Sequence, residues 1–358
     1  MNSPIEEKAN SKQKVLVIRM LTSADVCAIG LPTIRFFQKQ LADKEIHFLT
    51  FGDMAEVIRK AEPSVVVHKV EANQWPDDFF QAMESFLGLA EDIIIDGYSQ
   101  IVNLDTAFMP CFLARFLQDA GEPVIGNFLN MSIQKLITRV QAQSLGADYV
   151  NLASSYLDST FLGMYKWMTP WWQSSVVPDG GYPEFYLTQC CAFDIKQLDQ
   201  SICVVADKRL LKKAKSTKII GLCLDSSQDG YVYPDTDKLK RCLEQQGYQI
   251  WLEDECEGSL NSLLKAMAAS DLVVCKASGN RWFAQAVECP VLLISGACEP
   301  ATLMPDFATD PVSSCPQHAS YRSQQLNDSQ TCNCDKPENL TESIHSIFEH
   351  FAQEQSNG

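Results

Sequence analysis

The sequence has no hydrophobic run long enough to cross a bilayer. No part of the 358-residue chain reaches the ~18 consecutive apolar residues that a membrane-spanning helix requires. The first twelve residues, MNSPIEEKANSK, are polar and lack the apolar centre of a signal peptide. They are predicted to form a loose tail before the first strand. Both absences favour a cytoplasmic protein.

Positive charge is also scarce. The chain has 29 Lys and Arg against 45 Asp and Glu, which gives a formal net charge of −16 at pH 7. This excess disfavours nucleic acid as a partner, because it repels the phosphates. A smaller anionic ligand would need local basic residues or helix N-termini to offset the field.

What is present is an alternation of strand-like and helix-like segments. Short β-branched apolar runs predict strands at Lys14–Arg19, Glu45–Phe51, Ser64–Val70, Asp92–Gly97, Pro123–Phe128, Lys218–Leu224, Tyr248–Leu252, Asp271–Lys276 and Pro290–Ser295. Helical spacing separates them, and a final amphipathic helix is predicted at Glu338–Gln353. Alternation of this kind indicates parallel sheets covered on both faces, and so an α/β protein.

The length suggests about two domains of ~150 residues. The middle of the chain, near 151–215, is less regular and contains the turn signal VPDGGYP. We therefore predict an N-terminal Rossmann-like domain at 13–185, a linker at 186–216, a C-terminal Rossmann-like domain at 217–336, and a closing helix and tail at 337–358.

Several segments, taken in order, resemble glycosyltransferase family 9, the heptosyltransferases of bacterial lipopolysaccharide core. They are VLVIRMLTSADVCAIGLP, DIIIDGYSQ, KIIGLCLDSSQDGYVYP and SLNSLLKAMAASDLVVCKASGNRWFAQAVECPVLLISGACEP. The resemblance implies a GT-B fold, in which two Rossmann-like domains face each other across a cleft, with the closing helix packing back on the first half. It also implies an inverting, metal-independent transferase that takes a heptose or similar sugar from an ADP-heptose-like donor. The acceptor would be lipopolysaccharide core or another glycan, glycolipid or protein, with possible peripheral contact to the inner membrane.

Asp25 stands at the acidic position of the family's N-terminal motif, a few residues after the first strand. The resemblance implies that its carboxylate accepts the proton of the acceptor hydroxyl or assists electrostatically. The alternative is a helix N-cap, a role that Asp commonly takes.

On the donor side, the resemblance places the nucleotide near the turn after Lys276. Gly279 would let the backbone approach a phosphate, Ser278 would donate its hydroxyl, and Lys276 and Arg281 would supply positive charge. Trp282 would stack on a base or sugar, and Glu299 lies at the family's acidic-Pro corner. The alternatives are an ordinary strand-to-helix turn, solvated charges and a core tryptophan.

The donor motif departs from the family in three places. Ala277 replaces an Asp, Trp282 replaces a His, and Tyr231 replaces a phosphate-contacting Lys. Two hypotheses therefore compete: a transferase with a different donor, or a catalytically inactive heptosyltransferase-like protein that serves as a binding protein or scaffold.

Cysteine is abundant, with 14 in the chain. Cys298, Cys315, Cys332 and Cys334 form a late group that could hold structural zinc or iron, with His318 as an alternative fourth ligand to Cys298. Some relatives that modify autotransporters hold iron in this region. The alternatives are thiols without a role and a disulfide.

Overall fold

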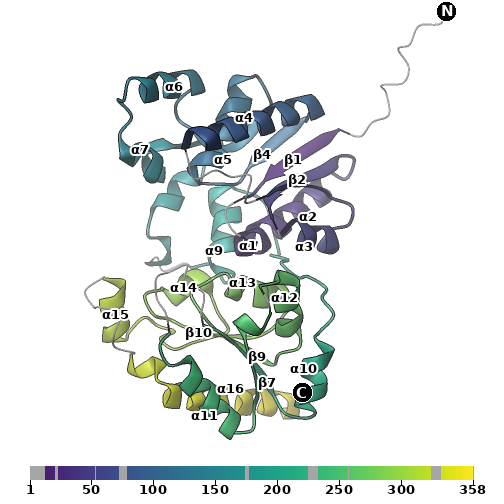
Figure 1. The fold of residues 1–358 in the computed structure, drawn as a ribbon, viewed down its shortest axis with the longest axis vertical. Helices are drawn as coiled ribbons and strands as arrows, with labels where there is room; N and C mark the ends of the chain where they lie inside the picture. Colours follow the sequence, from purple (N-terminus) through teal and green to yellow (C-terminus); the bar gives the residue numbers. More distant parts are fainter. Residues whose placement is uncertain are drawn as a thin grey trace, which may run out of the picture. The chain divides into compact units, whose positions relative to one another are not determined.

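The computed structural model describes residues 13–20, 23–52, 54–71, 79–173, 177–224, 233–256, 258–323 and 332–357. The chain forms two compact units, and it crosses between them more than once. Unit 1 comprises residues 1–171 and 183–199, and unit 2 comprises residues 172–182 and 200–358 (Figure 1). Each unit has its own sheet and its own core.

Unit 1 is built on a six-stranded sheet with the order β3-β2-β1-β4-β5-β6. Strands β1 to β5 are parallel, and the edge strand β6 runs antiparallel to β5. The strands are β1 (Lys14–Ile18), β2 (Glu45–Phe51), β3 (Val66–Val70), β4 (Gln100–Asn103), β5 (Val124–Leu129) and β6 (Leu157–Ser159). Their central residues are buried on both faces, as expected of a parallel sheet between helices.

Helices cover both faces of this sheet. On one face, Phe86 and Phe112 join Leu16 and Ile18 in a single core cluster, and on the other the ring of Phe48 lies against Gly30. A Cβ at Gly30 would lie 2.8 Å from Phe48 Cζ, so glycine allows this close approach. The helical segments are α1 (Ser23–Asp25), η1 (Val26–Gly30), α2 (Leu31–Gln40), α3 (Met54–Ala61), α4 (Phe79–Asp96), α5 (Phe108–Asp119), α6 (Ile133–Gln141), α7 (Ala147–Asn151), α8 (Ala153–Tyr156), η3 (Met164–Met168) and η5 (Phe185–Cys190).

The strand predicted at Asp92–Gly97 is wrong, because those residues up to Asp96 continue helix α4. Phe86, Ala90 and Ile93 are buried at helical spacing, whereas Ile95 is 82% exposed. A run of three isoleucines looks like a buried strand, but its burial follows the 3.6-residue period. The strand lies a few residues later, at β4.

Unit 2 has a five-stranded, fully parallel sheet with the order β11-β10-β9-β7-β8. The strands are β7 (Ile219–Cys223), β8 (Gln249–Leu252), β9 (Leu272–Lys276), β10 (Val291–Ile294) and β11 (Phe307–Ala308). The helical segments are α10 (Lys208–Ala214), α11 (Thr236–Gln245), η6 (Glu253–Cys256), α12 (Leu260–Ala268), α13 (Asn280–Ala286), α14 (Pro300–Leu303), α15 (Pro316–Arg322), η7 (Asn333–Asp335) and α16 (Pro337–Asn357). Between the units the chain passes through η4 (Trp171–Gln173) and α9 (Gly181–Glu184).

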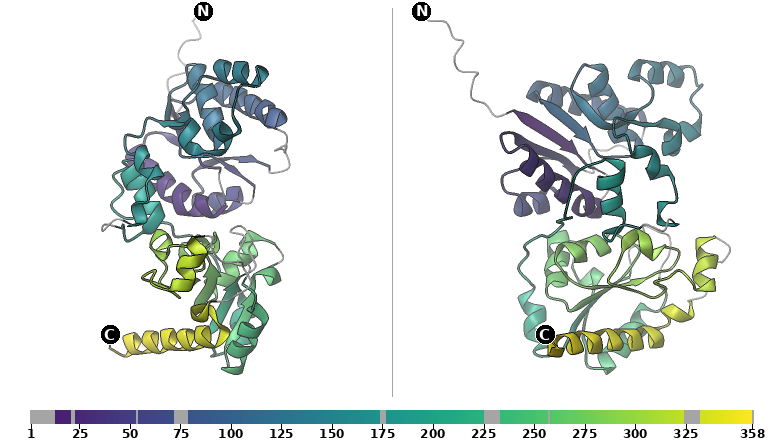
Figure 2. Two further views of the ribbon diagram at one scale, coloured as in Figure 1. Left: turned by 90° about the vertical axis from the view of Figure 1, so that its left-hand side faces the viewer. Right: turned by 180° about the vertical axis from the view of Figure 1, so that it is seen from behind.

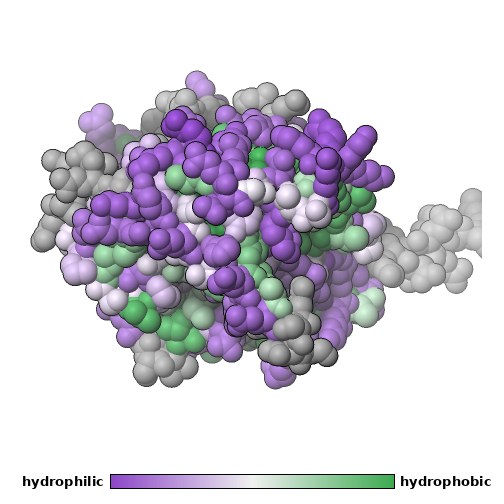
Figure 3. All heavy atoms as spheres, turned by 90° about the horizontal axis from the view of Figure 1, so that it is seen from below, coloured by the Kyte–Doolittle hydropathy of each residue, from purple (hydrophilic) through white to green (hydrophobic). Residues whose placement is uncertain are grey.

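The closing helix α16 packs on unit 2 itself and lies beside α11 (Figure 2). Its residues Leu340, Ile344 and Ile347 share a core cluster with Ile220 and Leu222 of β7. The helix therefore completes the core of unit 2. The face of the molecule seen in Figure 3 is mostly hydrophilic, with only small scattered apolar areas.

Candidate functional site

The sheet of unit 1 changes direction between β1 and β4. From β1 the chain adds β2 and β3 on one side, then returns to place β4 on the other. In open parallel sheets, ligands bind at such a point, beyond the carboxyl ends of the two neighbouring strands. Arg19 and Asp25 follow β1, and Asp105 follows β4, so these charged residues lie at the expected position of a site.

Arg19 links the ends of the two strands. Its side chain is fully buried, and Nη2 lies 2.5 Å from Asp25 Oδ2. Its Nη1 donates to the Leu104 carbonyl, and Nε lies 3.6 Å from Asp105 Oδ1. The guanidinium also lies over the ring of Tyr186, 5.1 Å from its centroid. One buried cation therefore contacts two carboxylates.

Of this group, the carboxylate that reaches solvent is Asp25. Its side chain is 14% exposed, whereas the side chains of Arg19 and Asp105 are at 0%. Asp25 has helical backbone angles, and its side chain makes no capping hydrogen bond to η1. The geometry thus matches an acidic group presented at a surface site and does not show the N-cap that the sequence also allowed.

The sheet of unit 2 has a corresponding point between β7 and β9. Ser278 and Gly279 form the turn between β9 and α13, so they lie beyond the carboxyl end of a strand at this point. Both are partly exposed, and Ser278 Oγ accepts a hydrogen bond from the Asn280 backbone N at 3.3 Å. Lys276, the last residue of β9, is only 2% exposed.

Arg281 and Trp282 lie inside unit 2. Arg281 is 4% exposed, and its guanidinium donates to the carbonyls of Leu303 and Met304 and to Gln285 Oε1. Burial lowers the pKa of Arg281. Trp282 is 8% exposed and packs against this guanidinium. The donors of Arg281 therefore fix the end of α14.

Replacing Arg281 is expected to act on stability. Arg281→Met leaves the carbonyls of Leu303 and Met304 without their donors, which costs about 3 kcal/mol. For a unit of this size, the midpoint of thermal unfolding should fall by roughly 6–12 °C. Arg209→Met is the matched control, because the Arg209 side chain is 92% exposed. An unchanged midpoint for Arg281→Met would contradict the structural role.

Glu299 and Cys298 lie at the start of α14. The Glu299 carboxylate accepts from Ser313 Oγ at 2.5 Å and lies 3.2 Å from Arg322 Nε. Cys298 Sγ lies 3.5 Å from the Glu299 carbonyl and 3.7 Å from Thr302 Oγ1. Both residues therefore have local contacts that hold α14 and α15. Tyr231, the third departure from the family motif, lies outside the described residues.

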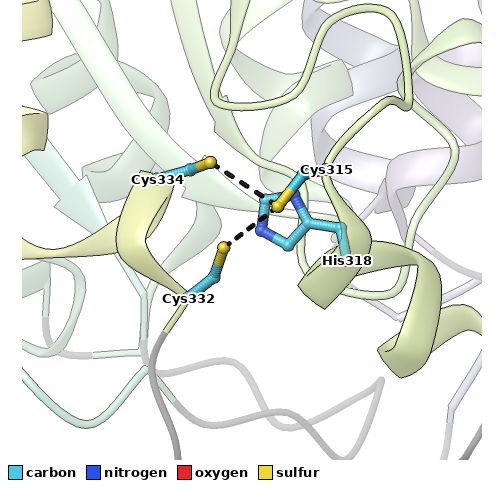
Figure 4. Close-up of side chains that lie close together, drawn as sticks. All are labelled: Cys315, His318, Cys332 and Cys334. Atoms are coloured by element: carbon cyan, nitrogen blue, oxygen red, sulfur yellow. Dashed lines mark hydrogen bonds between the residues drawn. The ribbon is translucent and has the colours of Figure 1, made fainter.

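Three thiols and one imidazole come together between α15 and η7 (Figure 4). One ligand atom each from Cys315, His318, Cys332 and Cys334 lies within 4.8 Å of the others. Cys315 Sγ lies 3.3 Å from Cys332 Sγ and 3.7 Å from Cys334 Sγ. Cys298 is not in this group, so His318, the alternative fourth ligand, is the one that the fold brings to the thiols.

The surroundings of the cluster suit a metal. His318 is fully buried; its Nε2 lies 2.9 Å from Asp335 Oδ2, and its Nδ1 lies 3.4 Å from Asp310 Oδ2. A metal-bound histidine commonly gives its other ring nitrogen to a carboxylate in this way. Burial acts to raise the pKa of Cys315, but backbone N–H groups and the Cys332 thiol outweigh burial and lower it. Burial raises the pKa of Cys332 and Cys334, so of the three thiols Cys315 is the one favoured as the thiolate, the form that binds metal.

The fold is shared with solved glycosyltransferase structures. A family 9 glycosyl transferase from Veillonella parvula matches with a TM-score of 0.59 at 12% identity, over 95% of this chain and 98% of the other. The E. coli ADP-heptose lipopolysaccharide heptosyltransferase II gives 0.56 at 12% identity, over 95% and 100%. The chain has the GT-B fold of the heptosyltransferases. The resemblance stated from the sequence is thus confirmed at the level of the fold.

A third similar structure contains a metal. It is the iron-containing dodecameric glycosyltransferase TibC from enterotoxigenic E. coli, with a TM-score of 0.54 at 9% identity, over 95% of this chain and 77% of that one.

No family model and no curated protein matches the sequence. Among the described residues, none of the helices combines the length and apolar character needed to cross a membrane.

Proposed function

We propose that the protein is a glycosyltransferase that moves a sugar from a nucleotide-sugar donor to an acceptor hydroxyl. The observation that carries the proposal is the Asp25 carboxylate, partly exposed at the direction change of the first sheet and held by a buried arginine. The fold that places it there is the fold of heptosyltransferases.

The proposed reaction inverts the configuration at the sugar and needs no metal in the chemical step. The acceptor hydroxyl attacks the anomeric carbon, and its proton passes to the Asp25 carboxylate. The bond from the anomeric carbon to the diphosphate breaks, and the nucleoside diphosphate leaves with the electron pair. The donor is a heptose or similar sugar on ADP or another nucleotide. The acceptor is lipopolysaccharide core, another glycan or glycolipid, or a protein, and the reaction takes place in the bacterial cytoplasm, with peripheral contact to the inner membrane.

The donor diphosphate is proposed to bind at the turn after β9. Ser278 and Gly279 are partly exposed there, so the Ser278 hydroxyl would donate to the diphosphate and Gly279 would let the backbone approach it. Lys276, at the end of the same strand, adds a positive charge close to the proposed phosphate position. Arg281 would support this turn by tying α13 to the end of α14, with Trp282 packed on its guanidinium, and Glu299 would tie the start of α14 to Arg322 of α15.

One observation favours the second hypothesis, a heptosyltransferase-like binding or scaffold protein without activity. The guanidinium of Arg281 already donates to Leu303, Met304 and Gln285, so this charge is not directed at a ligand. A donor site with less positive charge binds a diphosphate more weakly, because charge-assisted hydrogen bonds are the strong ones.

Thermal unfolding in the presence of nucleotides separates the two hypotheses. ADP, UDP, GDP and their sugars are each added at about 100 times an expected Kd, where binding stabilises the folded state by about 2.7 kcal/mol. A transferase should give a clear rise in midpoint with its own nucleotide. No rise with any nucleotide would reject the donor site and favour the scaffold. Ser278→Ala and Gly279→Ala should reduce the rise if the turn binds the diphosphate.

We also propose that Cys315, His318, Cys332 and Cys334 hold one structural zinc or iron ion. Three thiolates and an imidazole suit a closed tetrahedral site. Bound there, the ion would tie α15 to η7 and so to the start of α16. Asp310 fixes the loop before α15, because its Oδ1 accepts from the backbone N of Cys315 at 3.0 Å.

A further inference from the structure

The buried charges behind Asp25 form an ordered group within unit 1. Arg19 reaches the Leu104 carbonyl, Asp25 and Asp105 with three different nitrogens. Asp105 Oδ2 accepts from the Met20 backbone N at 2.6 Å, which fixes Asp105 to the segment after β1. The planar guanidinium has donors in fixed directions, so these contacts set the direction in which it meets Asp25.

Neighbouring polar residues hold this group from behind. Tyr186 lies under the guanidinium, and its hydroxyl donates to the same Leu104 carbonyl at 2.6 Å. Asn127 Nδ2 donates to the Tyr186 hydroxyl at 3.0 Å. The backbone N of Asp105 donates to Asn103 Oδ1 at 3.1 Å. The network spans the ends of β1 and β4, the interior of β5 and helix η5, and Asp25 is its member at the surface.

Burying the charge of an arginine costs free energy unless a negative group lies beside it. The carboxylate that meets this requirement for Arg19 also indicates what the arginine does. Asp105 is fully buried and cannot meet an acceptor, yet it neutralises Arg19. With Asp25 also counted, the group carries one positive and two negative charges and keeps a net negative charge at its exposed end. We propose that Arg19 is the positioning residue for the Asp25 carboxylate and that Asp105 is the counter-charge that keeps Arg19 in place. This inference rests on the proposed function and names how the same site is held.

The test compares three variants of the full chain. Arg19→Met combined with Asp105→Asn removes both buried charges together, so it leaves no unpaired buried ion and is expected to fold. Arg19→Lys keeps the charge but has one nitrogen in place of the fork. Arg115→Met is the control, because Arg115 forms a partly exposed i,i+4 pair with Asp119 in the same unit. Circular dichroism verifies the fold of each.

For each variant, kcat, KM for the donor and the Kd of its nucleotide are measured, and a crystal structure is determined. The double variant should lower kcat about 100-fold, as a misplaced catalytic group does, while KM for the donor and the Kd of its nucleotide stay unchanged. Arg19→Lys should recover part of this loss, and Arg115→Met should match the unaltered protein. A purely structural role would instead lower stability without this split between kcat and KM.

Crystal structures decide the positioning separately from the chemistry. In the double variant the Asp25 carboxylate should leave its present position or spread over several rotamers. An Asp25 side chain that stays in place, or an unchanged kcat, overturns the inference. If the unaltered protein transfers no sugar from any donor, the proposed function fails, and the crystal structures still show whether Arg19 positions Asp25.

Discussion

Asp25→Asn is expected to lower kcat for sugar transfer by roughly 10²–10⁴-fold, the usual contribution of a positioned acid or base. The amide has nearly the same shape as the carboxylate but cannot accept a proton from the acceptor hydroxyl. Asp25 lies in unit 1, and the proposed diphosphate site lies in unit 2, so the Kd of the nucleotide should stay nearly unchanged. Initial rates and calorimetric titration with the nucleotide measure the two effects.

Asp43→Asn is the matched control for this substitution. Asp43 is an exposed residue of unit 1, between α2 and β2, and its loss should leave kcat unchanged. If Asp25→Asn turns over at the rate of the unaltered protein, Asp25 is not the base. The ion pair between Arg19 and Asp25 would then have an electrostatic or structural role.

Loss of the metal is the second large effect expected. The purified protein should contain about one equivalent of zinc or iron, and Cys332→Ala should contain none. A ligand that binds only the folded state at 100 times its Kd adds about 2.7 kcal/mol, so the midpoint of unfolding should fall by roughly 5–11 °C. Elemental analysis and calorimetry provide both readouts, and a chelator should reproduce the shift in the unaltered protein.

Cys203→Ser is the control for the metal experiment, because Cys203 is an exposed thiol of unit 2 outside the cluster. It should keep both the metal and the midpoint. Cys298→Ser should also keep the metal, since Cys298 Sγ contacts Thr302 and the Glu299 carbonyl. The site would be rejected if the unaltered protein contained no metal and a thiol titration showed that Cys315, Cys332 and Cys334 are all free and reduced.

Strands with a simple apolar pattern could be predicted from the sequence: β7, β8, β9 and β10 of unit 2 lie within one residue of their predicted ends, whereas the two-residue edge strand β11 was not predicted. The error at Asp92–Gly97 had a second consequence. The strand was predicted to end at Gly97, whereas β4 ends at Asn103. Asp105 was therefore not recognised as a residue that follows the carboxyl end of a strand, and it was missed as part of the site. The edge strand β6 was also missed, since its three residues carry no periodic signal.

Arg19 was visible in the sequence as a charged residue that ends a buried strand. Its importance depends on contacts with Leu104 and Asp105, which are more than 80 positions away along the chain and which only the pairing of β1 with β4 brings close. The fourth metal ligand was open for a similar reason. Cys298 and His318 both lie within about 20 residues of Cys315 along the chain. The fold decides between them, because α15 brings His318 to the thiols whereas Cys298 lies at the start of α14.

The place of α16 affects the order in which the two units can form during synthesis. Unit 1 has all its strands and its returning segment once Asp199 has left the ribosome. The sheet of unit 2 cannot bury Ile220 and Leu222 fully until Ile344 and Phe348 have been made. Unit 1 can therefore fold first, and the unfinished second sheet exposes apolar surface to chaperones or to aggregation until α16 has been made.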